Sequence, residues 1–336
     1  MTKAGCYGSE TVVDTAGVTR GFLVCEKPGG NGGTMNFIRS SRLGGDWQLS
    51  PVPASGLLLA VTDDGAATYV VSSTVDTLWI GKRTRAGAFT TTRVATVEGS
   101  VRDATVAASG GRWWVVWSVS NGDCGCFRLY QAKTMGTRQA AHRLAFDGRN
   151  PALVATGASS VQMVAMYQDQ AEGGNIVVRD ARDTTWGAPA YVYGTATEKR
   201  FGSGPSIIRT GGVTRVAWRQ LRPGSSVVGY ADNATGKWVR HTFNTTAGTR
   251  ADYGFPYLTH SQGRTLVTWT HESTGDHGVA HVAELYRGRW TEASFDDAKT
   301  NSSGVIVAGL GSAGGRAQLV VDVDSGSASF TRLRTQ

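Results

Sequence analysis

Histidine and acidic side chains gather in one short stretch of the 336-residue chain, between His271 and His281. This stretch holds three of the six histidines, His271, His277 and His281, together with Glu272. A histidine titrates near neutral pH and can carry a proton, and histidines clustered with carboxylates can also bind a metal ion. The spacings are diagnostic of neither role, and an ordinary surface histidine is the common alternative. We place His271 and His277 in a loop, His281 in the following strand, and assign no metal site.

Arginines, carboxylates and aromatic residues recur in two further sets of predicted loops. Loops carry function because a scaffold positions them, and in a blade-like repeat these two sets converge on one face. The first set joins successive repeat units and contains Arg102, Asp103, Arg149, Asn150, Arg200, Phe201, Asp252, Tyr253 and Phe255. The second set follows the second strand of each unit and contains Glu26, Lys27, Ser118, Gln168, Asp169, Arg219, His271 and Glu272.

This mixture of side chains suits an acidic oligosaccharide. Aromatic faces stack on sugar rings, and the arginine fork binds a carboxylate or sulfate through two parallel hydrogen bonds. The alternative is that the Arg/Asp pairs bond backbone groups and hold the loops together. We predict substrate binding by Arg102, Asp103, Arg149, Arg200, Phe201, Arg219, Asp252 and Phe255.

The first hypothesis is an enzyme that acts on an acidic polysaccharide, either a lyase or a glycoside hydrolase. As a polysaccharide lyase, the protein would neutralise a uronate carboxylate with Arg200 or Arg219, and His271 or Tyr253 would remove the adjacent proton. As a glycoside hydrolase, the protein would use a pair of carboxylates on either side of the scissile bond. The candidates for this pair are Asp103, Asp169, Asp252 and Glu272. The catalytic candidates are therefore His271, Tyr253 and Glu272.

The alternative is a non-catalytic glycan-binding lectin or a protein-interaction module that gains avidity from several weak sites. Equivalent loop positions differ between the units, as Arg102, Arg149, Phe201 and Tyr253 show. This divergence favours one asymmetric site.

An internal repeat must position these loops. Apolar segments end at Trp117, Trp218 and Trp269, so the spacings are 101 residues, or two periods, and then 51 residues. Proline opens successive units at 151, 205 and 256, and a late tryptophan stands at 186, 238 and 290. In the unit that opens at Pro151 we predict strands over 152–156, 161–167, 175–180 and 188–193. A period near 50 with four short strands is typical of a propeller blade.

The predicted fold is therefore all-β, a single β-propeller domain over residues 1–336 with about seven four-stranded blades. We expect blades to start near residues 11, 57, 104, 151, 205, 256 and 304, with six blades as the alternative. The last unit is short, so we expect the N- and C-terminal segments to close the ring and remove exposed strand edges.

Two turns resemble those of the sialidase-like, Asp-box-type propellers. The segment Ser40-Ser-Arg42-Leu-Gly44-Gly-Asp-Trp47 has the Ser-x-Asp-x-Gly-x-x-Trp register with Arg42 at the aspartate position. The segment Asp232-Asn-Ala-Thr-Gly236-Lys-Trp238 is one residue shorter. The resemblance implies a propeller architecture for most of the chain. It does not extend to the arginine triad and Tyr/Glu pair of active sialidases.

The charge and composition of the chain limit the classes of partner and cofactor that we expect. The net charge of +8 favours anionic ligands, but the chain has no run of consecutive Lys/Arg, so we expect no nucleic-acid partner. No apolar run reaches the roughly 18 residues that a membrane span requires. We expect no cofactor, although Thr62-Asp-Asp64-Gly and Asp322-Val-Asp324-Ser-Gly could hold a structural calcium ion, with plain turns as the alternative.

The cysteines are Cys6, Cys25, Cys124 and Cys126. An even count is compatible with two disulfides, and Cys6 with Cys25 is the first pairing to test. The abundance of Gly, Ser, Thr and Trp is typical of exported proteins. The N-terminal residues lack the apolar core of a secretory signal, which taken alone indicates a cytosolic protein. From the composition we expect instead a secreted monomer whose signal peptide is absent from this sequence.

Overall fold

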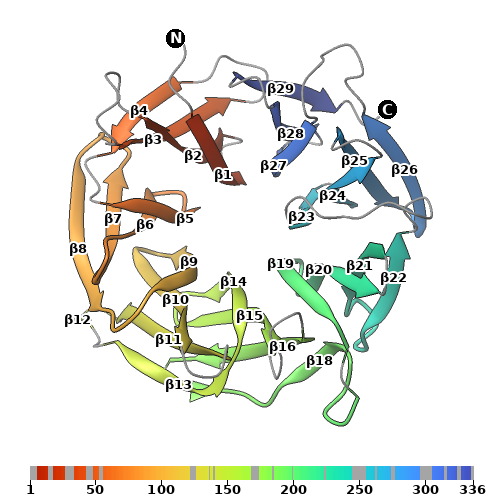
Figure 1. Ribbon diagram of the computed structural model, residues 1–336, viewed down its shortest axis with the longest axis horizontal. Helices are drawn as coiled ribbons and strands as arrows, with labels where there is room; N and C mark the ends of the chain where they lie inside the picture. The colour runs from red at the N-terminus through yellow and green to blue at the C-terminus, as the bar shows by residue number, and fades with distance from the viewer. Residues whose placement is uncertain are drawn as a thin grey trace. The chain divides into compact units, whose positions relative to one another are not determined.

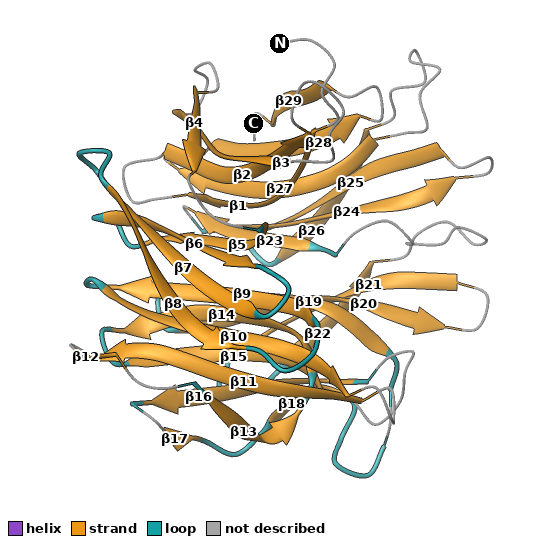
Figure 2. Ribbon diagram, turned by 60° about the vertical axis from the view of Figure 1, so that its left-hand side comes forward, coloured by secondary structure: helices purple, strands orange, loops and turns teal. Residues whose placement is uncertain are grey.

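The computed structural model describes residues 6–13, 18–26, 34–42, 48–52, 56–121, 126–135, 137–138, 141–167, 174–183, 185–198, 200–222, 225–243, 255–261, 263–273, 277–295, 305–313, 316–323 and 327–333. Within these ranges the chain forms strands, turns and loops (Figure 2), and no helix there is long and apolar enough to span a membrane. Consecutive strands pair into antiparallel sheets. We call each sheet a blade and number the blades in chain order.

The chain divides into two compact units. The central unit comprises Ala54–Arg222 and Gly229–Thr242, and the terminal unit comprises Met1–Pro53, Pro223–Val228 and Phe243–Gln336. Blades 2 to 4 and most of blade 5 belong to the central unit (Figure 1). Their strands are β5 (Leu57–Asp63), β6 (Ala67–Ser73), β7 (Thr77–Thr84) and β8 (Phe89–Thr96) in blade 2; β9 (Val101–Ser109), β10 (Arg112–Asn121), β11 (Cys126–Met135), β12 (Thr137–Arg138) and β13 (His142–Asp147) in blade 3; β14 (Arg149–Gly157), β15 (Ser160–Tyr167), β16 (Asn175–Arg182), β17 (Thr185–Trp186) and β18 (Ala190–Tyr193) in blade 4; and β19 (Gly202–Thr210), β20 (Val213–Arg222), β21 (Ser225–Asp232) and β22 (Val239–Phe243) in blade 5.

The terminal unit contains blades 1, 6 and 7. Their strands are β1 (Cys6–Val13), β2 (Val18–Glu26), β3 (Thr34–Arg42) and β4 (Gln48–Val52); β23 (Tyr257–Ser261), β24 (Arg264–Ser273), β25 (His277–Tyr286) and β26 (Arg289–Phe295); and β27 (Val305–Ala313), β28 (Arg316–Val323) and β29 (Ser327–Leu333). Strand β27 packs beside both β1 and β23. Strand β1 pairs with β2 in blade 1, and within the described ranges blade 7 has three strands. Closure of the whole ring stays a prediction.

The blades begin close to the predicted starts. The largest difference, five residues, is at blade 1, where β1 begins at Cys6 against the expected residue 11. The outer edge of blade 4 is divided into two short strands: β18 lies within the predicted strand over 188–193, and β17 precedes it. The division follows from Gly187 and Pro189: the Gly187 amide turns back to bond the Asp180 carbonyl at 2.8 Å, and proline has no amide to donate to the ladder.

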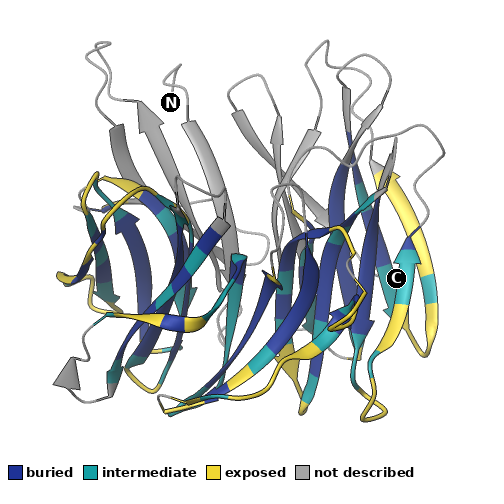
Figure 3. Cartoon of the chain, turned by 60° about the horizontal axis from the view of Figure 1, so that its bottom comes forward, coloured by how far each residue is buried: buried dark blue, intermediate teal, exposed yellow. Residues whose placement is uncertain are grey.

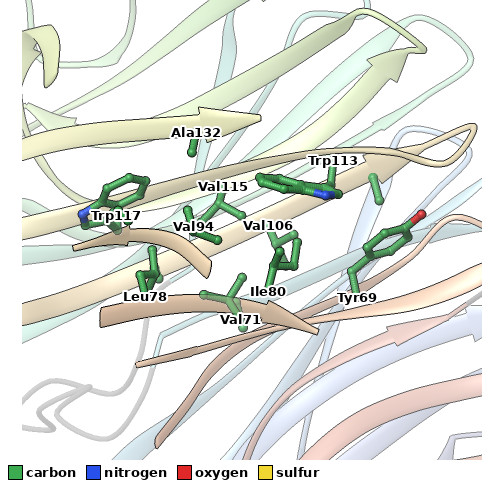
Figure 4. Close-up of a cluster of buried hydrophobic side chains, with 14 of the residues drawn as sticks. Tyr69, Val71, Leu78, Ile80, Val94, Val106, Trp113, Val115, Trp117 and Ala132 are labelled. Atoms are coloured by element: carbon green, nitrogen blue, oxygen red, sulfur yellow. The ribbon is translucent and has the colours of Figure 1, made fainter. Parts of the chain in front are cut away.

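The core of the central unit lies between successive blades. Six consecutive residues of β6, Ala67 to Ser72, are buried, and blade 3 packs against this strand within the central unit. The outer strand β8, in contrast, exposes four consecutive residues (Figure 3). Figure 4 shows Tyr69, Val71 and Ile80 of blade 2 packed against Val106 and Trp117 of blade 3. Buried apolar surface between blades therefore holds this part of the chain together.

The repeated aromatic residues join one blade to the next. In the central unit Phe146 of blade 3 meets Trp186 of blade 4 edge-on, and Tyr193 of blade 4 packs on Trp218 of blade 5 at 5.5 Å between ring centroids. In the terminal unit Phe243 stacks on Trp269 at 5.2 Å. The roughly 50-residue aromatic period of the sequence is thus a repeated packing contact.

Asp64 links blades 2 and 3 by hydrogen bonds. Its carboxylate accepts the backbone amide of Gly111 at 2.9 Å and those of Ala66 and Ala67 at 2.9 and 2.8 Å. Burial opposes ionisation of this carboxyl group, but the amides and the Tyr69 hydroxyl favour the charged form and hold the pKa of Asp64 below its usual value. The Asp63 carboxylate accepts hydrogen bonds from the Gly65 amide, the Thr68 hydroxyl and the Arg85 guanidinium. Both carboxylates therefore stabilise the turn between β5 and β6. Within the described ranges no group of His, Cys, Asp and Glu is arranged to hold a metal ion.

Asp64→Ala is expected to lower the free energy of unfolding at pH 7 by about 1–3 kcal/mol, because three amides lose their acceptor. The folded-state pKa lies below the unfolded value of about 3.9, so this stabilisation is complete above that value and disappears as the pH falls through the folded pKa. Urea unfolding of both proteins from pH 7 to pH 3 measures the difference. Asp76→Ala, at an exposed turn of the same blade, is the control. A difference that stays constant down to pH 3 would contradict this role.

The backbone register of blade 1 places Cys6 directly opposite Cys25 on β1 and β2. Opposite residues of antiparallel strands lie about 4.5–5.5 Å apart at Cα, within the range that a disulfide spans. This register agrees with the first pairing to test, and the disulfide itself stays a prediction. Cys124 lies outside the described residues.

Candidate functional site

In blades 3 and 5 the two sets of predicted loop residues meet at one edge of the blade, while Gln168 and Asp169 of blade 4 lie outside the described residues. The antiparallel register pairs Asp103 at the start of β9 with Ser118 near the end of β10, and Ser203 in β19 with Arg219 in β20. The first strands β9, β14 and β19 are neighbours in turn. The edges of blades 3, 4 and 5 therefore form one surface, which we call the arginine surface and define by Arg102, Asp103, Arg149, Tyr167, Arg200 and Phe201.

Several of these residues lie in strands, contrary to the predicted loops. Arg102 and Asp103 belong to β9, Arg149 to β14, Ser118 to β10 and Arg219 to β20, while Arg200 and Phe201 directly precede β19. The strands continue beyond the buried tryptophans because their last residues still pair across the ladder. Polar residues at a strand end resemble a turn in sequence, which explains the error.

Asp103 acts as a clamp between blades 3 and 4. Its carboxylate accepts the Ser118 hydroxyl at 2.9 Å, the Asn150 side-chain amide at 3.0 Å and the Asn150 backbone amide at 3.3 Å. Asn150 has a φ of 48°, in the left-handed region, where asparagine is among the tolerated residues. These bonds occupy Asp103 and fix the backbone beside Arg149, in agreement with the loop-holding alternative for this carboxylate.

Arg149 projects from this clamp with its guanidinium on an aromatic ring. The guanidinium carbon lies 4.6 Å from the centre of the Phe127 ring, and Nε lies 3.9 Å from the Asp103 carboxylate. The Nε atom is buried and, in the part of the chain that the structure describes, has no hydrogen-bond acceptor. About a third of the side chain is exposed, 35%. Arg149 is therefore oriented by its surroundings, and the exposed part of its side chain carries a permanent positive charge that can attract an anion.

Exposed aromatic residues continue the surface on blades 4 and 5. Tyr167 is 41% exposed and Phe201 is 44% exposed. Tyr167 follows Met166, which pairs with Arg149. The bridge between Gly174, directly before β16, and Gly202 joins the start of β16 to the start of β19. A Cβ at Gly174 would lie 2.2 Å from the Tyr167 carbonyl oxygen, so only glycine fits this approach.

Asn175 positions the segment that carries Arg200. Its side chain accepts the Arg200 amide at 2.8 Å and donates to the Thr195 carbonyl at 2.8 Å. The Arg200 guanidinium pairs with Glu198, and both side chains are about half exposed. An exposed pair of this kind is weak, so Arg200 can exchange Glu198 for a ligand. Arg219, in contrast, donates from Nε to Ser203 at 3.1 Å, on a half-buried side chain.

The remaining predicted residues belong to the terminal unit. Phe255 is exposed and precedes β23. His271 and Glu272 lie in β24, and His277 begins β25, so the predicted loop positions of these residues were wrong. His281 lies in β25 as expected and stacks on Trp269 at 5.2 Å. Asp252 and Tyr253, and the side chains of His271 and Glu272, fall outside the described residues. The catalytic assignment therefore stays a prediction.

Sequence reasoning missed Phe127, Tyr167 and Asn175 as site residues. Phe127 begins the apolar part of β11 and has no motif around it. The sequence pattern places Tyr167 at the end of the predicted strand over 161–167. Asn175 follows a glycine pair, Gly173-Gly174, and such a pair beside a polar residue was the one available signal of close backbone contact.

Asp103→Ala is expected to lower the free energy of unfolding by about 2 kcal/mol, because two buried donors of Asn150 lose their acceptor. Asp147→Ala is the matched control, since Asp147 makes an exposed pair with Arg143 on β13 and should cost less than about 1 kcal/mol. Chemical denaturation measures both. Equal losses in the two variants would refute the clamp.

Comparison with known proteins addresses the fold. No protein-family model matches the sequence, and no curated protein matches it. Among solved structures, a catalytically inactive virginiamycin B lyase from Staphylococcus aureus with quinupristin is 12% identical and superposes with a TM-score of 0.60, covering 99% of this chain and 97% of its own. The fold is a β-propeller.

Two other similar propellers have different functions. A variant of the Aleuria aurantia lectin in complex with α-methyl-L-fucoside is 11% identical, with a TM-score of 0.52 over 86% of this chain and 94% of its own. The endosialidase of phage phi92 is 9% identical, with a TM-score of 0.52 over 95% of this chain and 63% of its own. At these identities the matches confirm the all-β propeller prediction and leave function to the residues of the site.

Proposed function

We propose that this propeller binds an acidic oligo- or polysaccharide on the arginine surface. The observation that carries the proposal is Arg149: its guanidinium lies on the Phe127 ring, and about a third of its side chain is exposed. An arginine fork held in this way is suited to a carboxylate or sulfate. The Asp103–Asn150 clamp supports the proposal because it fixes the backbone of Arg149 before any ligand arrives.

The neighbouring residues supply the rest of the recognition. Tyr167 and Phe201 offer exposed aromatic faces, on which sugar rings stack, while Arg102 and Arg200 add positive charge on either side. These residues differ from blade to blade, which favours one asymmetric site and a single chain of sugars. The net charge of +8 would bring such a polyanion to the surface.

Outside the cell, where acidic glycans are abundant, the protein would meet such ligands as a monomer. We also propose that the protein is related to the sialidase-like propellers. This relationship rests on the segments Ser40–Trp47 and Asp232–Trp238. The second segment forms a turn between β21 and β22, with the Gly236 amide bonded to the Asn233 carbonyl at 2.9 Å. Cleavage of the glycan by His271, Tyr253 and Glu272 is the additional step that the sequence predicts.

A glycan array that contains uronate, sulfate and sialate chains, with neutral chains beside them, tests the binding proposal. We expect signals for acidic chains and none for neutral ones, weakening as salt is added. Incubation of each positive glycan with the protein, followed by analysis for unsaturated or new reducing ends, tests cleavage separately. If the protein binds a glycan without producing new chain ends, it acts as a lectin and not as an enzyme. Binding of neutral chains only would reject the proposal.

A further inference from the structure

Lys133 is a charged side chain buried inside the central unit, away from the arginine surface. It lies on β11, is 1% exposed, and is among the largest fully buried side chains of the described residues. Its Nζ atom has no hydrogen-bond partner in the part of the chain that the structure describes. A buried ammonium group is costly unless an anion or acceptors compensate for its lost hydration.

A second unsatisfied donor lies beside Lys133. Trp114 on β10 is its direct cross-strand partner, so both side chains leave the same face of blade 3. Trp114 is 2% exposed, and its indole Nε1 also lacks an acceptor among the described residues. The indole N–H and the ammonium group can only donate. This face of the blade thus presents donors without a matching acceptor.

Blade 4 covers this face and leaves both donors unsatisfied. Trp114 packs with Val161, Ala181 and Trp186 of blade 4. Gln131, two residues before Lys133 on β11, has a side-chain oxygen that already receives the Trp186 indole N–H at 2.9 Å. The Gln131 amide nitrogen lies 2.6 Å from His142 Nε2.

One carboxylate acts on Lys133 from a distance. Burial lowers the pKa of Lys133, and the charge of Asp183, in the exposed turn between β16 and β17, partly opposes this effect. Asp183 directs its backbone amide to the Ser159 carbonyl at 2.9 Å. It attracts the ammonium group without satisfying its donors.

We propose that a small monovalent anion of the halide type binds between blades 3 and 4, held by Lys133 Nζ and Trp114 Nε1. A halide accepts several hydrogen bonds from any direction and carries one negative charge. It would therefore satisfy both donors and compensate the charge of the ammonium group. A water molecule would accept the hydrogen bonds but would leave the charge uncompensated. The site is structural, and it would make blade packing depend on the anion.

Bromide provides the direct test. Crystals of the wild-type protein grown in sodium bromide should show an anomalous peak within hydrogen-bond distance of Lys133 Nζ and Trp114 Nε1. In solution, the melting temperature should rise by about 2 °C when sodium gluconate is replaced by sodium bromide at equal ionic strength. A water molecule or empty density at this position in bromide-grown crystals would overturn the proposal.

Matched variants separate this site from general salt effects. Lys133→Met should remove the bromide-dependent shift, and Trp114→Phe should reduce it by about half. Lys237→Met, at an exposed turn residue, should keep the shift of the wild type. An equal shift in Lys133→Met and Lys237→Met would contradict the site. If Lys133→Met fails to fold, the anomalous peak in the wild type still decides.

Discussion

Trp218→Ala is expected to lower the free energy of unfolding by about 3–5 kcal/mol, because it opens a cavity where blades 4 and 5 meet. Trp218 is completely buried and packs against Val164, Val192 and Val216 in one apolar cluster. Tyr193 lies on one side of its ring, and a Cβ at Gly229 would lie 2.5 Å from the ring on another. Because little space surrounds the ring, the neighbours cannot collapse far into the cavity.

Two further variants test whether lost packing causes this decrease in stability. The Trp218 indole nitrogen has no acceptor within the described ranges, so Trp218→Phe removes no hydrogen bond and should cost less than half as much. Trp238→Ala removes the same side chain at a half-buried position and should also cost less. Guanidinium unfolding followed by circular dichroism measures all three. A Trp218→Ala loss below 1 kcal/mol, or one equal to that of Trp238→Ala, would show that this contact does not hold the blades together.

Arg149→Met is expected to weaken binding of an acidic glycan by about ten- to hundredfold, with the fold intact. A charge-assisted hydrogen bond contributes about 1.5–3 kcal/mol, and about 1.4 kcal/mol corresponds to a factor of ten in the dissociation constant. Methionine keeps the apolar contact with Phe127 and removes only the charge and the donors. Arg149→Lys should give an intermediate loss, because a lysine keeps the charge but not the planar fork.

Arg143→Met is the control for Arg149→Met. Arg143 is an exposed arginine on β13, where it pairs with Asp147, and its removal changes the net charge of the protein by the same amount. Calorimetric titration with the best glycan of the array measures both. If Arg143→Met lowers the affinity as much as Arg149→Met does, net charge and not a defined site explains the binding.

Much of the fold was predictable because the same packing contact recurs in the blades. Trp117, Trp218 and Trp269 mark the second strands, and a period near 50 residues between such markers predicts a blade. The division of β17 from β18 was less visible, since it depends on the turn that Gly187 makes. The ends of the second strands were misjudged for a similar reason: whether Ser118 or Arg219 continues a ladder depends on a partner strand that sequence alone does not show.

The positions of the candidate residues at the blade edge were predictable, but their contacts were not, and their role in binding stays a prediction. The repeat placed Arg102, Arg149, Arg200 and Phe201 at one edge of successive blades, and the structure brings them to that edge. The sequence repeat did not show that Asp103 is occupied by hydrogen bonds from Asn150 while the Arg149 side chain stays partly exposed. In the sequence both are simply charged residues near the start of a strand. Burial and hydrogen-bond partners separate Asp103 from Arg149, and these belong to the folded chain.

The central claim, recognition of an acidic glycan by the arginine surface, is tested most directly by one comparison of affinities. Titration calorimetry measures the wild-type protein with a uronate oligosaccharide and with the same chain after its carboxyl groups have been reduced to alcohols. We predict that the acidic chain binds at least about tenfold more tightly, as expected for one lost charge-assisted contact. Equal affinity for the two chains, or no binding of either, would contradict the account.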